Sequence, residues 1–396
     1  MRRPAAGGHR GTVTTTVPHG PLPTAERALG PDLARGAMLL FIALANSHYF
    51  LQGDDYRGGF PLDGTRLDDA VAWATSTFVD GRAFPMFGAL FGYGIAQIVR
   101  RNAERTGWGL RFLLWRRSAV LIVIGFLHAV LLFSGDILTA YGVLLLIGAF
   151  AVRWKDRWLL IVAAAFFVLC ALPSLDSFSI ATYGPDASML SPDLATILAE
   201  RPSVSLYVMA LGPVGFAAPF LVGLWAGRRR VLERPDQHRR LLVATAILGV
   251  TAAVLGAQPA ALMTIGAIDV PGDDVLSLVG PLHDGTGVLG GLGYAALITL
   301  LATRPRVAAN RAVRAVAATG QRSMTCYLMQ SVAWTVLFTP FLLDLSGRIG
   351  VAANAAIATG VWLVTVVVAD RMARAGLRGP FEVLTRRVTY WERVGA

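Results

Sequence analysis

Long apolar runs alternate with short polar segments along most of the chain. A helix needs about 20 mostly apolar residues to cross a bilayer. Charge clusters and Pro/Gly turns divide the apolar runs into ten segments. Their approximate limits are 36–52, 82–99, 118–134, 137–152, 158–174, 205–227, 241–262, 286–303, 317–341 and 351–370. The pattern predicts an all-α, polytopic membrane protein of about ten transmembrane helices.

The distribution of Lys and Arg gives an independent test, because these residues collect in the cytoplasmic loops of membrane proteins. With the N-terminus inside, the cytoplasmic segments carry 30 of the 36 Lys and Arg residues. Asp residues gather instead on the opposite side, within 54–55, 63–69 and 269–274. The charges favour ten spans with both termini in the cytoplasm.

The composition agrees with a membrane protein. Hydrophobic residues make up 55% of the chain and charged residues 15%, whereas soluble domains have about 25% charged residues. The net charge of +11 follows from basic loops that face anionic lipid headgroups. Membrane lipids are therefore expected partners, and nucleic acid is not.

Three regions divide the chain. Residues 1–30 are polar and rich in Gly, Pro, Thr and Arg, which predicts a disordered cytoplasmic segment with no signal peptide. The membrane domain is predicted over 31–375, with a long outer loop over 174–204 that acts as a lid or as a passive connector. Residues 376–396 predict an amphipathic cytoplasmic helix. Its apolar stripe consists of Phe381, Leu384, Val388 and Trp391.

Several ionisable residues lie within or beside the outer parts of the predicted spans. An ionisable group in lipid is costly, so it usually faces a bundle interior or a water-filled cavity. The residues concerned are His48, Asp80, Arg82, His128, Asp136, His283 and Asp284. Their common depth indicates an outer polar cavity.

Each of these residues also has a structural interpretation. Arg82 could extend to lipid headgroups or pair with Asp80, and His128 could bond a neighbouring helix. Asp136 follows Ser-Gly and precedes the fourth span, which favours a helix N-cap. His283 fits a polar helix entry. No HExxH or similar ligand spacing occurs, so we expect no metal.

Five stretches together resemble the YeiB-like family of bacterial membrane proteins, known as domain of unknown function 418. They are Arg35-Gly36 leading to Ala45-Asn46, FVDGRAFPMFGALFGYGIA, HAVLLFSGDILTAYG, TGQRSMTCYLMQS at 319–331 and RGPFEVLTRRVTY at 378–390. The resemblance covers the chain from about residue 31. It implies a multi-pass protein of the bacterial inner (plasma) membrane.

That family is similar to the transmembrane acyltransferases, which include heparan-α-glucosaminide N-acetyltransferase. The similarity implies transfer of an acyl group from cytoplasmic acyl-CoA, such as acetyl-CoA, to an extracytoplasmic hydroxyl or amine. The acceptor is a small molecule, glycan or lipid. His48 best fits the place of the family's histidine.

The residues suggest roles for this chemistry. His48 could act as general base, with Asp54 or Asp55 to orient it and Arg82 to stabilise an oxyanion. His128 and Asp136 complete the candidate catalytic set. The coenzyme phosphates require cytoplasmic cations, and the candidates are Arg100, Arg101, Arg116 and Arg117.

Two other functions stay open at this point. A small-molecule transporter or exporter would use the same cavity, with His128 and Asp136 as proton-coupling groups. A non-catalytic membrane protein is the second alternative. The acceptor, the acyl chain and a homodimeric state are equally open.

Overall fold

The computed structural model describes residues 28–390, which are almost entirely helical. The N-terminal segment 1–30, for which disorder and no signal peptide were expected, lies outside these residues except for 28–30. Trp391 of the predicted apolar stripe also lies outside them. The elements are α1 Leu29–Ser47, η2 His48–Phe50, β1 Tyr56–Arg57, β2 Phe60–Pro61, α2 Arg66–Phe78, α3 Ala83–Arg101, α4 Gly107–Leu131, α5 Leu138–Gly148, η3 Ala151–Arg153, α6 Asp156–Cys170, η4 Phe178–Ile180, α7 Leu194–Arg228, α8 Arg239–Thr264, α9 Asp273–Ala302, α10 Pro305–Ala309, α11 Arg311–Gln321, α12 Ser323–Phe338, α13 Val351–Arg374 and α14 Pro380–Tyr390.

The predicted all-α character is confirmed, since every predicted apolar segment contains helix. Within residues 28–390, five helices are long and apolar enough to cross a membrane by length and composition: α4, α7, α8, α9 and α13. These helices support a membrane protein. The number of ten spans stays a prediction, because the other helices are shorter or less apolar.

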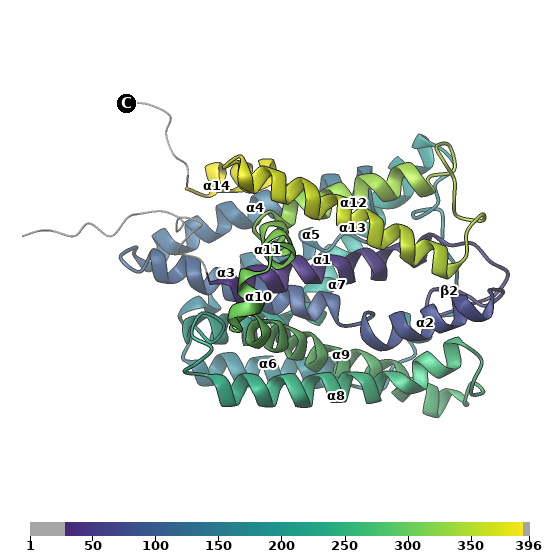
Figure 1. Ribbon diagram of the computed structural model, residues 1–396, viewed down its shortest axis with the longest axis horizontal. Helices are drawn as coiled ribbons and strands as arrows, with labels where there is room; N and C mark the ends of the chain where they lie inside the picture. The colour runs from purple at the N-terminus through teal and green to yellow at the C-terminus, as the bar shows by residue number, and fades with distance from the viewer. Residues whose placement is uncertain (1–27, 391–396) are drawn as a thin grey trace, which may run out of the picture.

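The long helices run along the long axis of the molecule (Figure 1). Helix α14 and the start of α1 lie at one end, which we call the terminal end. The β1–β2 hairpin and α2 lie at the other end, which we call the hairpin end. The antiparallel hairpin pairs Tyr56 with Pro61 and Arg57 with Phe60. Helix α1 therefore carries its last residues to the hairpin end.

Small residues allow the central helices to pack closely. A methyl group added at Gly92 of α3 would overlap the backbone of Phe220 in α7, and one at Gly223 of α7 would overlap Ala89 in α3. Small residues of this kind are typical of helix interfaces in membrane proteins. Gly92 and Gly223 thus let α3 and α7 approach each other at backbone distance.

The segment expected to be a loop over 174–204 is helical from Leu194 onward. The Asp193 carboxylate accepts a hydrogen bond of 2.7 Å from the Thr196 amide, which caps the first turn of α7. Pro202 lies inside this helix and does not end it. The loop is thus about ten residues shorter than the Pro and Ser content indicated.

Helix α14 is attached to α12 through Glu382. Its carboxylate accepts hydrogen bonds from the Met324 amide at 2.8 Å and from both the amide and the hydroxyl of Thr325. A carboxylate at a helix N-terminus satisfies free amides and complements the helix dipole. Thr385 is buried whereas Leu384 is exposed. The helix thus presents a more polar face to the bundle than the predicted apolar stripe implied.

Asp68 joins α2 to the start of α13. One carboxylate oxygen accepts a 2.8 Å bond from the Ala352 amide, and the other accepts bonds from the amide and hydroxyl of Thr65. Partial burial acts to raise the pKa of this carboxyl, but the hydrogen bonds outweigh it and hold the pKa below the ordinary value of 3.8.

We expect Asp68→Ala to lower the free energy of unfolding by about 1–2 kcal/mol, because a helix cap and a tie between helices are lost. A lowered folded-state pKa gives stability that is present above pH 3.8 and is lost as the pH falls through the folded pKa. Thermal unfolding at pH 7 and pH 3 measures both effects. Asp69→Ala, which removes a half-buried carboxylate from the same turn of α2, is the control. Equal melting temperatures of the two variants at pH 7 would contradict the role of Asp68 in joining α2 to α13.

Candidate functional site

His48 lies buried at the hairpin end, where α1 passes into a single 3₁₀ turn. Its ring stacks on Phe60 of the hairpin, with centroids 4.0 Å apart, and contacts Tyr49 at 4.2 Å. Nδ1 lies 3.3 Å from the Leu44 carbonyl. Nδ1 therefore carries the proton and donates to this carbonyl, which leaves the Nε2 lone pair available.

The carboxylate beside His48 belongs to Asp80. Its Oδ2 lies 3.9 Å from His48 Nε2, and neither Nε2 nor Asp80 Oδ1 has a hydrogen-bond partner among the described residues. Asp54 and Asp55 are both exposed in the segment before the hairpin. Asp80, which is much farther along the sequence, thus occupies the place expected for Asp54 or Asp55.

Arg82 is completely buried, with a relative exposure of 0%. It donates to the Asp80 carbonyl, to Nε2 of His283 at 2.8 Å and to the Ala253 carbonyl at 2.6 Å. It therefore points into the bundle and does not extend to lipid headgroups. Its Nε has no partner in the described part of the chain. One donor of the guanidinium is thus left for another group.

Gly81 lets the chain turn tightly between Asp80 and Arg82. Its φ of +73° lies in the left-handed region, which favours glycine. A Cβ at this position would lie 3.0 Å from Cε1 of His283. The turn and the close approach of α9 both require glycine, so the sequence Asp80-Gly81-Arg82 places Arg82 against His283 and Asp80 beside His48.

Asp284 extends this cluster toward the surface. Its carboxylate accepts a hydrogen bond from Ser177 at 2.8 Å and lies 3.3 Å from Nδ1 of His283. Tyr49 interacts electrostatically with both Asp80 and Asp284. His48, Asp80, Arg82, His283 and Asp284 thus form one group, which we call the His48 cluster.

His128 and Asp136 form a second buried group. Nδ1 of His128 lies 2.8 Å from Asp136 Oδ1, and the Tyr327 hydroxyl lies 3.5 Å from the same oxygen. Asp136 Oδ2 accepts bonds from the amide and hydroxyl of Thr139. The expected capping of the fourth span by Asp136 is therefore present. The carboxylate also holds His128, whose Nε2 has no partner among residues 28–390.

The basic residues expected to hold coenzyme phosphates differ in their surroundings. Arg100 pairs with Glu233 at 2.8 Å and donates to the Gly227 carbonyl, so structural contacts occupy it. Arg117 has a buried Nε without a partner in the described chain, and the ionisable groups that interact with it are Tyr390, Arg35 and Glu382. Arg101 and Arg116 also make interactions. Arg117 is thus the best placed of the four for an added anion.

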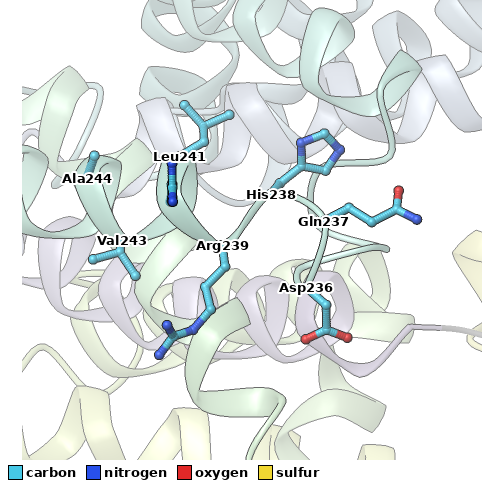
Figure 2. A pocket seen from close by; sticks show the side chains of 8 residues that line it. Asp236, Gln237, His238, Arg239, Leu241, Val243 and Ala244 are labelled. Carbon is cyan, nitrogen blue, oxygen red and sulfur yellow. The ribbon is translucent and has the colours of Figure 1, made fainter.

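A surface hollow of about 750 Å³ surrounds the start of α8, away from both histidine groups. Its lining consists of Asp236, Gln237, His238, Arg239, Arg240, Leu241, Val243 and Ala244. Figure 2 shows these side chains spreading from one turn in different directions. They do not converge on a common point, so the hollow lacks the arrangement of a catalytic site. Within residues 28–390, no group of three or more His, Cys, Asp or Glu could hold a metal ion.

The structure adds four residues to the predicted catalytic set: Asp80, His283 and Asp284, which the sequence placed only at the outer polar cavity, and Tyr327. Asp80 and His283 are about 200 positions apart in the sequence. Only the turn at Gly81 and its contact with α9 bring them into one group. Tyr327 lies almost 200 residues from Asp136 along the chain. Its only sequence signal is its place in TGQRSMTCYLMQS, one of the stretches that carries the family resemblance.

Comparisons with known proteins agree with that resemblance. Residues 226–392 match the family model "Protein of unknown function (DUF418)". "Uncharacterized protein YxaH" of Bacillus subtilis is 27% identical, over 94% of this chain and 97% of its own length. "Uncharacterized protein YeiB" of Escherichia coli is 26% identical, over 92% of this chain and 96% of its own length.

Proposed function

We propose, from its confirmed place among the YeiB-like DUF418 proteins, that this chain is a membrane acyltransferase. In this proposal ten spans cross the bacterial inner membrane, the terminal end faces the cytoplasm, and the hairpin end faces outward. Acyl-CoA is the cytoplasmic donor. The acceptor is an extracytoplasmic hydroxyl or amine.

The observation that supports this proposal most is the unpartnered Nε2 of buried His48 opposite Asp80. Nε2 removes the proton from the acceptor as its oxygen or nitrogen attacks the thioester carbonyl. The C–S bond breaks and a C–O or C–N bond forms, and His48 returns the proton to the leaving thiolate. Asp80 stabilises the imidazolium that exists between these steps.

Arg82 is suited to the developing negative charge. Three of its contacts hold the guanidinium in place, and Nε remains as a buried donor. A fixed donor in a water-poor site stabilises an oxyanion without reorganisation at the moment of reaction. Hydrogen bonds at catalytic groups are often long before substrate binds, which fits the 3.9 Å between His48 and Asp80.

Donor binding tests the proposal. Acetyl-CoA at 100 times its Kd should stabilise the purified protein by about 2.7 kcal/mol, because it binds the folded state. The melting temperature with and without acetyl-CoA measures this. Arg117→Ala should remove the shift and exposed Arg374→Ala should keep it. An unchanged melting temperature at saturating acetyl-CoA would contradict the proposed acyltransferase function.

The buried His128–Asp136 pair favours one alternative, a proton-coupled transporter. A buried acid and imidazole within a bundle are typical of proton relays. Flux of a substrate into vesicles that contain no acyl donor would favour this alternative over the acyltransferase. Transfer of a labelled acetyl group without such flux would favour the enzyme.

A further inference from the structure

Aromatic side chains gather where α4 begins and α5 ends. Trp108, Phe112 and Trp115 recur at intervals of four and three along α4 and thus lie on one face of that helix. The ring centroid of Trp115 lies 5.4 Å from that of Phe112 and 5.8 Å from that of Phe150. The Trp115 indole also donates a 3.0 Å hydrogen bond to the Leu146 carbonyl of α5. Trp108, Phe112, Trp115 and Phe150 therefore form one group, which we call the Trp115 cluster.

Arg111 lies on the same face of α4 and contacts two of these rings. Its guanidinium carbon is 4.9 Å from the ring centroid of Trp108 and 4.9 Å from that of Phe150. An aromatic ring attracts a cation at this distance, so the two rings hold the guanidinium in place. Within residues 28–390, Arg111 makes no hydrogen bond and no ion pair. Its N–H donors are thus oriented by the rings and available to an anion.

The surroundings of Arg111 favour an anion. Residues 100–117 contain six arginines and one acidic residue, Glu104. Arg153 adds a further cation beside the start of α4, where it donates to the Arg105 carbonyl at 3.0 Å. The nearest acidic residue to Arg153 in the sequence is Asp156, which already pairs with two arginines at the end of α7. A negatively charged partner therefore complements this surface.

The exposed rings favour a lipid over a soluble anion. Helix α4 is apolar enough to cross a membrane, and its 25 residues exceed the roughly 20 that the hydrocarbon core requires. Its basic first turns therefore extend to the headgroups, where tryptophan is enriched. Trp108 is 59% exposed and Phe112 is 55% exposed. Acyl chains can cover these rings, whereas a soluble anion would leave them in water.

We propose that Arg111 and the Trp115 cluster bind one anionic phospholipid. Its phosphate lies on the guanidinium of Arg111, whose planar fork matches two phosphate oxygens, and its acyl chains cross the exposed rings of Trp108 and Phe112. Arg153 supplies additional positive charge beside the headgroup. This site is independent of the proposed acyl transfer, because it contains no residue of the His48 cluster and none of the four arginines expected to hold coenzyme phosphates.

Native mass spectrometry of the purified full chain in a neutral detergent tests the inference, with phosphatidylglycerol as the probe. We expect Arg111→Gln to weaken binding of the first phosphatidylglycerol by about 5-fold, which is what one arginine contributes near an anionic lipid surface. Zwitterionic phosphatidylcholine should lose less affinity. Arg306→Gln is the matched control, because Arg306 is exposed on α10 and contacts no aromatic ring among residues 28–390. Its affinity should equal that of the wild-type protein.

Phe150→Leu keeps the charge but removes one of the rings that hold Arg111. It should weaken phosphatidylglycerol binding by about 2- to 5-fold, and it keeps the test decisive if Arg111→Gln does not fold. Wild-type affinity in both variants would overturn the site. Displacement of the lipid by an equal concentration of glycerol 3-phosphate would overturn the lipid assignment in favour of a soluble phosphate.

Discussion

We expect His48→Ala to reduce acyl transfer by about 100-fold or more while the protein still folds and inserts. General acid–base catalysis contributes about 10²–10⁴-fold in enzymes, and no other histidine of the His48 cluster has a free ring nitrogen, because Arg82 and Asp284 occupy those of His283. Transfer of a labelled acetyl group by protein in proteoliposomes measures the effect.

His238→Ala is the matched control, because His238 lies at the start of α8 and contacts the Arg229 carbonyl. Its transfer rate should equal that of the wild-type protein. Asp80→Asn should give an intermediate rate, since the imidazolium of His48 loses its counter-charge but keeps a polar neighbour. Wild-type turnover by His48→Ala would remove His48 from the mechanism.

The largest expected effect on stability belongs to Asp136→Ala, at about 3 kcal/mol or more. Removing a buried acceptor leaves each of its donors with an unsatisfied, desolvated polar group. Here four donors lose their acceptor: the His128 ring, the Tyr327 hydroxyl, and the amide and hydroxyl of Thr139. The melting temperature of purified protein measures the loss.

Asp136→Asn separates the hydrogen bonds from the charge, because an amide oxygen can accept the same bonds. It should destabilise the protein less than Asp136→Ala. Exposed Asp236→Ala is the control for loss of a carboxylate elsewhere. A melting temperature of Asp136→Ala equal to that of the wild-type protein would show that His128 is satisfied by another group.

The sequence predicted the helices well because apolar runs bounded by charge clusters report the same property that makes a helix partition into an apolar environment. It also identified Asp136 as a cap, since Ser-Gly-Asp before an apolar run is a local signal. The family resemblance was confirmed over most of the chain. Each of these predictions rests on a pattern of residues that are close together in the sequence.

Contacts between distant segments could not be predicted in this way. Asp54 and Asp55 are close to His48 in sequence, but the chain turns them outward, whereas the α2–α3 turn brings Asp80 to the ring. A short helix over 194–200 was expected from LATILAE, but its continuation through Pro202 into the sixth span was not, because Pro202 and nearby serines indicated a break. Pro202 is the ninth residue of α7, where it removes one backbone hydrogen bond and crowds the carbonyl one turn earlier, yet the helix continues through it.

The hairpin that stacks Phe60 on His48 has a consequence for the turnover number of the proposed reaction. The imidazole is buried under this aromatic ring, and the Gly58 amide donates to the Ala181 carbonyl, so under the proposed function this part of the chain would have to move before a substrate reaches Nε2. When such an opening precedes chemistry, the motion can limit the turnover number.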